Sequence, residues 1–435
     1  MSVSFPLAWT TQSAVALLLC LVLAPTTTVA ELTLEVAEQL ALTADPAVAG
    51  ARARGLALQQ QAVADGQLPD PKLGFGAYNV PVDSFSLDRE PMTQLFTRLQ
   101  QSFPRGDTLR YQRQRSEWLG RAEFATAALK RRQIERDVRS TFLELYYQQQ
   151  AAVVVQQSRG LFQQLVDITG AHFAAGRVSQ QDVLEAQLEL SRLDDRAARI
   201  AGDIDEQRAE LARWLGDTAQ QPISAEFPML PALPSYAALG DGLVQHPSVQ
   251  SATAQVQADQ QMVRAAREQY KPGWDVGVEY RKRFGEDADG DDLPDMLAAM
   301  VTMDLPLFTG KRQDKRLAAS RQNTEAARQL REQRLLELQR TLATTYARWT
   351  RLNEQEALYS DRLVTEAADN SDAALHSYQS GVTGFATLMR ARITELDVRL
   401  QELRVRVDRA KAEAALLFLR PPENRPDSVA QGAQP

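Results

Sequence analysis

An internal repeat constrains the fold of this chain more than any other feature of its sequence. The segment Asp45-Pro46-Ala47-Val48 recurs 201 residues later as His246-Pro247-Ser248-Val249. Further landmarks recur in the same order: Pro71 with Pro272, Gly76 with Gly277, Pro104 with Pro306, Gly106 with Gly310, and Phe173-Ala174-Ala175-Gly176 with Tyr378-Gln379-Ser380-Gly381. Chance rarely produces such an ordered series, so the sequence predicts a tandem duplication.

The two repeats are predicted to share one plan: a helix, two short strands, a very long helix, a tight turn and a returning helix. The first repeat spans 31–220, the inter-repeat linker 221–234 and the second repeat 235–420. The predicted elements are a helix over 34–67, strands near 72–81 and 93–103, a helical hairpin over 107–215, strands near 273–282 and 296–305, and a helical hairpin over 310–419.

The helical hairpins are predicted to be unusually long. No proline occurs from Asp107 to Thr169, and a helix of about 60 residues extends roughly 90 Å. This helix is expected to break around 170–176. Apolar residues recur at heptad-like spacing on both returning helices, which predicts a coiled-coil core. They are Leu190, Leu193, Ala197, Ile200, Ile204, Leu211 and Leu215 in the first repeat, and Ile393, Leu396, Leu400, Leu403, Val407, Ala410, Ala414 and Leu417 in the second.

The strands alternate apolar and polar residues. Trp274, Val276, Val278 and Tyr280 alternate with Asp275, Gly277, Glu279 and Arg281, as in a barrel wall between lipid and a wet lumen. Lumen-facing side chains are therefore expected at Arg98, Asp275, Glu279 and Arg281. A soluble antiparallel sheet with one solvated face gives the same alternation. The aromatic ends of the strand, together with an export signal, favour lipid.

Four strands cannot close a barrel, because the smallest membrane barrels need about eight. Two chains would supply eight strands around a filled interior, whereas three chains would supply twelve around an open lumen. The predicted fold class is therefore mainly α with a membrane β-barrel portion: a tandem-duplicated helix–hairpin–helix chain. It would form a trimeric 12-stranded β-barrel continued by a long α-helical coiled-coil tunnel.

The N-terminus is predicted to be a signal peptide over 1–30. An apolar core from Ala14 to Ala24 precedes a cleavage position after Ala30, although no Lys or Arg precedes the core. Cys20 suggests a lipid anchor, but the large Leu19 before it disfavours lipidation. Beyond the signal no apolar stretch reaches the twenty residues of a membrane helix, so membrane insertion is expected through strands. The tail over 421–435 is predicted to be disordered.

Composition and charge exclude several kinds of function. The net charge of −7 argues against nucleic-acid binding, which needs a clustered basic face. The sequence contains no nucleophile–base set and no Gly-rich phosphate loop, and its single cysteine lies in the predicted signal. We therefore expect no catalytic residues, no cofactor and no metal site, and no enzymatic activity. The acidic run over 286–292 is interpreted as a solvated hairpin tip, because it lacks the spacing of a calcium loop.

Two turn segments occupy matching places in the two repeats. The first runs His172-Phe173-Ala174-Ala175-Gly176-Arg177-Val178-Ser179-Gln180-Gln181-Asp182-Val183-Leu184, and the second runs from Ser377 to Met389. Each is similar to the aromatic-x-x-Gly-x-x-(Ser/Thr) tip, followed by a helix start, of the TolC-like outer-membrane efflux proteins. This resemblance covers nearly all of 31–420. Within the family, the Phe-Pro before the first long helix and the stretch over 305–312 are more similar to heavy-metal or multidrug efflux members.

The resemblance implies a homotrimer in outer-membrane lipid of a Gram-negative bacterium, with helices extending into the periplasm. Its implied partners are a periplasmic adaptor (membrane fusion) protein and an inner-membrane pump. The implied adaptor-docking and gating residues are Gly176, Val178, Ser179, Gly381, Val382 and Thr383. An entrance ring of acids, known in some members, would have to come from Asp182 and Glu185, because the second repeat carries Thr387-Leu388-Met389-Arg390 there. Asp182 also suits a helix start, where it favours the helix dipole.

The sequence thus predicts the exit duct of a tripartite efflux system that passively exports metal ions or small toxic compounds. Three alternatives remain: a periplasmic coiled-coil adaptor, a structural scaffold, and an exit duct for type I protein secretion. The transported substrate is not indicated, because the pump largely selects it.

Overall fold

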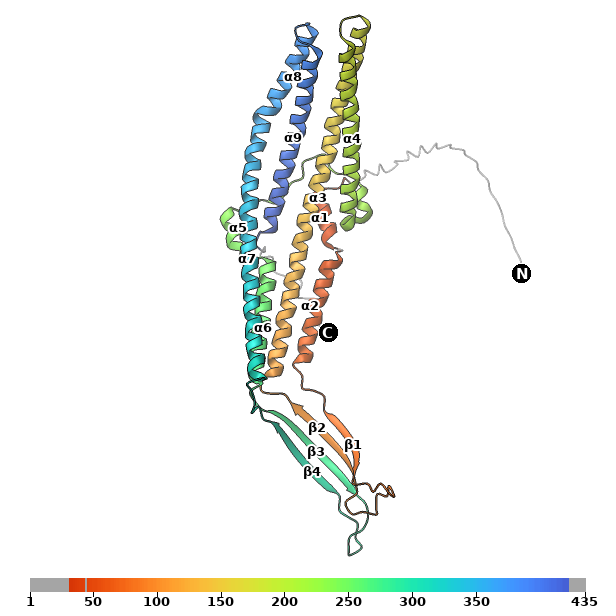
Figure 1. Cartoon of the computed structure of the whole chain (residues 1–435), viewed down its shortest axis with the longest axis vertical. Coiled ribbons are helices and arrows are strands. Elements are labelled where there is room, and N and C mark those ends of the chain that lie inside the picture. Colours follow the sequence, from red (N-terminus) through yellow and green to blue (C-terminus); the bar gives the residue numbers. More distant parts are fainter. Residues whose placement is uncertain (1–30, 44, 422–435) are drawn as a thin grey trace, which may run out of the picture.

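The fold is taken from a computed structural model, which describes residues 31–43 and 45–421. The predicted signal peptide with Cys20, and the predicted tail from 422 onward, lie outside these residues. Most described residues are helical, and the helices run side by side in one long bundle (Figure 1). The sheet lies at one end of this bundle and the two helical turns lie at the other.

Two helices, not one, precede the first strand: α1 (Leu34–Thr43) and α2 (Pro46–Asp65). The expectation of a single helix over 34–67 is wrong. Asp45 has an extended backbone, and its Oδ1 accepts a hydrogen bond from the backbone N–H of Ala47 at 2.7 Å. Pro46 then occupies the first helical position, where its missing N–H costs nothing. His246 and Pro247 start α6 in the same way in the second half of the chain.

The first helical hairpin consists of α3 (Thr108–Ala174) and α4 (Gln180–Leu215). The 67 residues of α3 correspond to a rod of about 100 Å. The helix continues through Gly170 and ends at Ala174, within the range 170–176 where its break is predicted. A single glycine costs a helix only about 1 kcal/mol, which packing along the rest of α3 offsets.

The second half contains a similar hairpin with one irregularity. Its elements are α5 (Tyr236–Gly242), α6 (Pro247–Glu268), α7 (Gln313–Leu358), a π-helical segment (Tyr359–Leu363), α8 (Val364–Gln379) and α9 (Phe385–Phe418). Short 3-10 helices lie at Gly216–Gln220 and Leu243–Gln245. The rod that corresponds to α3 is therefore helical throughout but contains a π turn.

Four strands form one antiparallel sheet in the order β1-β2-β3-β4. They are β1 (Lys72–Tyr78), β2 (Gln94–Phe103), β3 (Gly273–Arg283) and β4 (Met296–Asp304). The pairing of β2 with β3, with Leu99 opposite Val278, joins the two halves of the chain. Both edges of the sheet, β1 and β4, lack a neighbouring strand within the described residues.

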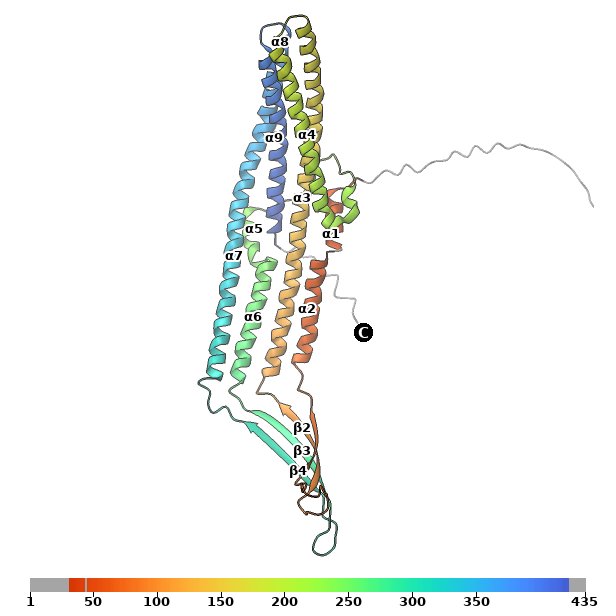
Figure 2. The same cartoon turned by 45° about the vertical axis from the view of Figure 1, so that its right-hand side comes forward.

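The hydrophobic core runs along the helices. One cluster joins α1, α3, α4, α8 and α9 and contains buried residues of the predicted stripes, among them Leu193, Ile200, Leu400 and Val407. A smaller cluster joins α5, α7 and the end of α9. The packing pairs agree with Figures 1 and 2: α3 contacts α2 and α6 near the sheet, and α4 and α9 toward the turns. Within the described ranges, none of the helices combines the length and the apolar character needed to cross a membrane.

Candidate functional site

One face of the sheet is apolar and exposed. Phe75 is 72% exposed, Leu297 75% and Val301 63%. Other exposed side chains with the same alternation are Leu73, Leu95, Leu99, Phe103, Trp274, Val276, Val278, Tyr280 and Met303. A sheet in water turns its apolar face to the core and its charged face to solvent. Here the apolar face is uncovered within the described residues, so the polarity of the sheet is reversed.

The opposite face carries the four side chains predicted to face a lumen. Arg98 and Glu279 are directly opposite each other in the β2–β3 register, and Arg98 Nε donates to Glu279 Oε2 at 2.5 Å. Arg281 forms a second ion pair with Glu279 at 2.5 Å. Glu279 is only 5% exposed. Asp275 lies four residues before Glu279 on β3. It accepts a hydrogen bond from the hydroxyl of Ser102, which is directly opposite on β2. The structure thus brings Arg98, Glu279 and Arg281 into one cluster, with Asp275 on the same face of the sheet. That these side chains face a lumen stays a prediction.

The connection between α3 and α4, the first of the two turns, depends on a glycine and on a capped helix start. Gly176 has φ +69°, a left-handed conformation that favours glycine at a helix C-terminus. Ser179 then begins α4: its hydroxyl accepts from Asp182 N–H at 3.3 Å, and Asp182 Oδ2 accepts from Ser179 N–H at 2.9 Å. This reciprocal capping box gives Asp182 a structural role. Val178 lies half-buried between these residues.

The second turn begins like the first but is capped differently. Gly381 has φ +76°, and Val382 beside it is 78% exposed. The N-cap of α9 is Gly384, which has no side-chain cap. The assignment of a terminal Ser/Thr to this copy of the motif is wrong, because Gly384 corresponds to Ser179 and Thr383 lies one residue earlier. The second turn therefore lacks the hydroxyl cap of the first.

The two turns lie against each other. The rings of His172 and Tyr378 are 6.4 Å apart between centroids. Burial and the nearby negative charge of Asp182 raise the pKa of the Tyr378 hydroxyl. Asp182 thus faces the other hairpin as well as capping its own helix. Glu185 lies one turn further along α4, where it lines a shallow groove with Leu184 and Leu188. An acidic ring would consist of Asp182 and Glu185 from several copies of the chain, so it stays a prediction.

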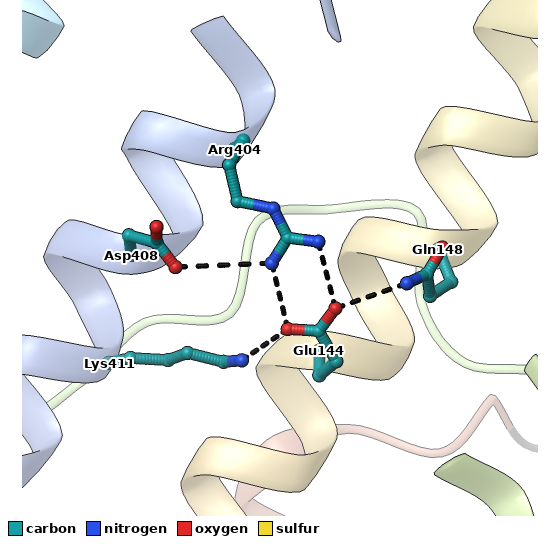
Figure 3. A network of polar contacts seen from close by, with 5 residues as sticks. All are labelled: Glu144, Gln148, Arg404, Asp408 and Lys411. Carbon is teal, nitrogen blue, oxygen red and sulfur yellow. Dashed lines mark hydrogen bonds and ion pairs between the residues drawn. The ribbon is translucent and has the colours of Figure 1, made fainter. Parts of the chain in front are cut away.

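A polar network joins α3 of the first hairpin to α9 of the second (Figure 3). Glu144 of α3 accepts hydrogen bonds from both terminal nitrogens of Arg404 on α9, each at 2.9 Å. Lys411 of α9 donates to the same carboxylate. Gln148 donates to it at 3.1 Å, and Asp408 lies 3.9 Å from Arg404.

The network stabilises the ionised form of the Glu144 carboxylate. Burial alone would raise the pKa of Glu144, but the hydrogen bonds and charges of Arg404 and Lys411 outweigh it and lower the pKa to about 2. The Arg404 guanidinium also lies 3.5 Å from the ring centroid of Tyr147, a cation–π contact. The sequence does not indicate this network, because Glu144 and Arg404 are 260 positions apart and each is one charged residue among many on its helix.

The described residues contain no group of three or more His, Cys, Asp or Glu side chains placed to hold a metal ion. The features that the described residues do present are an apolar face of the sheet, a charged opposite face and two exposed turns.

Comparison with known proteins finds a family match in the second half of the chain. Residues 238–419 match the family described as outer membrane efflux protein. The resemblance to TolC-like outer-membrane efflux proteins is confirmed. A search of curated proteins found no match to the chain.

Solved membrane proteins share the fold over most of their length. A membrane protein from Pseudomonas aeruginosa matches with a TM-score of 0.78 at 16% identity, over 89% of this chain and 90% of that one. The outer membrane protein VceC from Vibrio cholerae matches with a TM-score of 0.74 at 20% identity, over 89% and 95%. The open state of the Neisseria gonorrhoeae MtrE outer membrane channel matches with 0.74 at 14% identity, over 89% and 88%. At these identities the likeness establishes the fold.

Proposed function

We propose that this outer membrane efflux family protein is the exit duct of a tripartite efflux system in the outer membrane of a Gram-negative bacterium. It acts as a passive channel, not as an enzyme, for metal ions or small toxic compounds. An inner-membrane pump and a periplasmic adaptor deliver the substrate.

The observation that carries the proposal is the reversed polarity of the sheet. Side chains such as Phe75 and Leu297 are exposed on one face, while the Arg98–Glu279–Arg281 cluster lies on the other. Burying an apolar side chain of this size stabilises a protein by about 1.5–3 kcal/mol. An uncovered face of a dozen such residues is stable only against an apolar surrounding, and bilayer lipid supplies one.

The open edges of the sheet support a trimer. Within the described residues β1 and β4 each have one edge without a partner, and exposed edges invite pairing with another chain. Three copies paired edge to edge give twelve strands, which close around an open lumen. The four helices below each sheet then continue the barrel as a tunnel of about 100 Å.

The exposed turns support docking of an adaptor. The turn between α3 and α4 and the turn between α8 and α9 lie at the end of the bundle away from the sheet (Figure 1). The first contains Gly176, Val178 and Ser179, and the second contains Gly381, Val382 and Thr383. In a trimer six such turns surround the far end of the tunnel, where a partner protein would meet them.

Adjacent residues on β2 provide a matched test. Leu99 belongs to the apolar face and Gln100 to the opposite face. A cation at the middle of a lipid-facing strand costs about 2–4 kcal/mol. We expect Leu99→Arg to abolish recovery of trimers from the outer-membrane fraction, while Gln100→Arg leaves it nearly unchanged.

The readouts are the oligomeric mass after detergent extraction, membrane fractionation, and drug or metal sensitivity of a strain that lacks the chromosomal copy. Equal tolerance of both substitutions would show that the apolar face does not contact lipid. A soluble periplasmic monomer or dimer would favour an adaptor or scaffold.

A further inference from the structure

An amphipathic surface lies where the sheet meets the helices, in the connection from β4 to α7. Leu307 is 71% exposed and Phe308 89%. The basic residues Lys311, Arg312, Lys315 and Arg316 follow, and all are exposed. Figures 1 and 2 place this connection at the junction between the strands and the helices. We call residues 305–316 the junction segment.

The apolar part of the junction segment continues the apolar face of the sheet. Phe103, Trp274 and Met303 lie side by side in register across β2, β3 and β4, and each is at least 40% exposed. Leu305 and Leu307 follow Met303 with the same two-residue alternation. Aromatic side chains collect where lipid tails give way to headgroups, so this row indicates the level of that boundary.

The cations of the junction segment differ from those of the equivalent place in the first repeat. There, Arg105 pairs with Asp304 at 3.3 Å, Arg110 with Asp107 at 3.1 Å and Arg113 with Glu117 at 2.9 Å. In the junction segment the structure shows no acidic partner for any of the four cations. Its only acid, Asp314, accepts a hydrogen bond from the Tyr270 hydroxyl at 2.6 Å.

The four cations are exposed at the start of α7. Gln313, the first residue of the helix, is buried against the protein. At 100° per residue, Lys315 lies on nearly the opposite side of the helix and Arg316 about 60° from Gln313. Both are exposed, as are Lys311 and Arg312 before the helix. The four charges thus follow the exposed Phe308 within eight residues. Exposed apolar residues beside unpaired cations are typical of a segment that lies at an anionic membrane surface.

We propose that the junction segment binds anionic phospholipid headgroups of the periplasmic leaflet. Leu307 and Phe308 insert among the acyl chains, and Lys311, Arg312, Lys315 and Arg316 contact the lipid phosphates. This inference rests on the proposed membrane location and adds to it a preference for lipid charge. Headgroup layers are roughly 5–8 Å thick on each side of a bilayer, a depth that one helical turn spans.

The test uses the mature full chain as extracted from the membrane, reconstituted into nanodiscs of phosphatidylcholine with or without phosphatidylglycerol. Annular lipid retained by the protein is measured by native mass spectrometry. Each cation near an anionic surface contributes about 1 kcal/mol, so we expect wild type to enrich phosphatidylglycerol at least about tenfold. The quadruple variant Lys311→Gln, Arg312→Gln, Lys315→Gln, Arg316→Gln is expected to lose this enrichment.

Two other exposed cations on α7, Arg331 and Arg340, provide the matched control. They lie more than a dozen residues further from the sheet, hence about 20 Å or more along the helix, and carry no ion pair in the structure. Arg331→Gln with Arg340→Gln should leave the enrichment unchanged.

Three outcomes would overturn the inference: no enrichment in wild type, enrichment retained by the quadruple variant, or equal loss in the control. Dissociation of the quadruple variant into monomers would also overturn it, because the cations would then pair with a neighbouring chain. Failure of wild type to fractionate with the outer membrane would instead refute the proposed function.

Discussion

The Glu144 network is expected to hold α3 against α9, and removing its carboxylate should loosen both helices. Glu144→Gln keeps the size of the side chain but leaves Arg404 and Lys411 without their anion. The difference between the ordinary pKa of 4.5 and about 2 corresponds to about 3 kcal/mol. Because the cations are partly exposed, at 29% and 24%, solvent screening reduces our expectation to about 2 kcal/mol.

Hydrogen–deuterium exchange measures this loosening locally. A loss of about 2 kcal/mol raises exchange through local opening roughly 30-fold in peptides that cover 140–150 and 400–412. Glu354→Gln is the matched control, because Glu354 pairs with Arg351 on an exposed helix face where both side chains are more than half exposed. There we expect less than about 0.5 kcal/mol. Unchanged exchange in Glu144→Gln, or an equal change in the control, would refute the reasoning.

The same network predicts a pH dependence with a definite sign. The folded-state pKa of Glu144 lies below its unfolded value, so its contribution is complete above about pH 4.5. It is lost as the pH falls toward about 2. Protection of α3 and α9, normalised for intrinsic exchange, should therefore decrease across this window in wild type and much less in Glu144→Gln.

Three further predictions follow from the turns and the sheet. Gly176→Trp or Gly381→Trp should abolish efflux while leaving an inserted trimer, whereas Gly202→Trp on the exposed face of α4 should not; normal efflux at normal abundance would exclude docking at the turns. Glu279→Gln should leave its two arginine partners uncompensated and add one net positive charge per chain to the lumen. The reversal potential in planar bilayers should then shift toward anions, and no shift would place this cluster outside the conduction path. Asp182→Ala should weaken the α4 cap by about 1 kcal/mol, measured as faster exchange over 180–188; unchanged exchange would contradict a capping role.

The order of helices and strands was predictable because its signals are local. Alternation identified β3, and the absence of proline over 107–169 identified α3, both within a few residues of the observed bounds. The break between α1 and α2 was also encoded locally, since an Asp before a proline is an N-cap signal.

Contacts between distant segments were not predictable in the same way. Glu144 meets Arg404 and Lys411 because α3 and α9 bring these residues to the same level with the required rotation of each helix, and no local sequence pattern indicates that rotation. The Arg98–Glu279 pair depends equally on the register between β2 and β3. The trimer, the lumen and the docking of an adaptor remain predictions, because they concern contacts outside one chain.

The π turn takes up an insertion in the second rod. The displacement between matched landmarks grows from 204 residues at Gly106 and Gly310 to 205 at Phe173 and Tyr378. The second rod therefore contains one residue more than α3 between these landmarks, and the π turn over Tyr359–Leu363 accommodates one extra residue within a helix. Residues beyond Leu363 thus keep the orientation of their counterparts in α3. The duplicated halves differ in length yet present like faces, so a partner that binds both turns would meet six sites of similar orientation in a trimer.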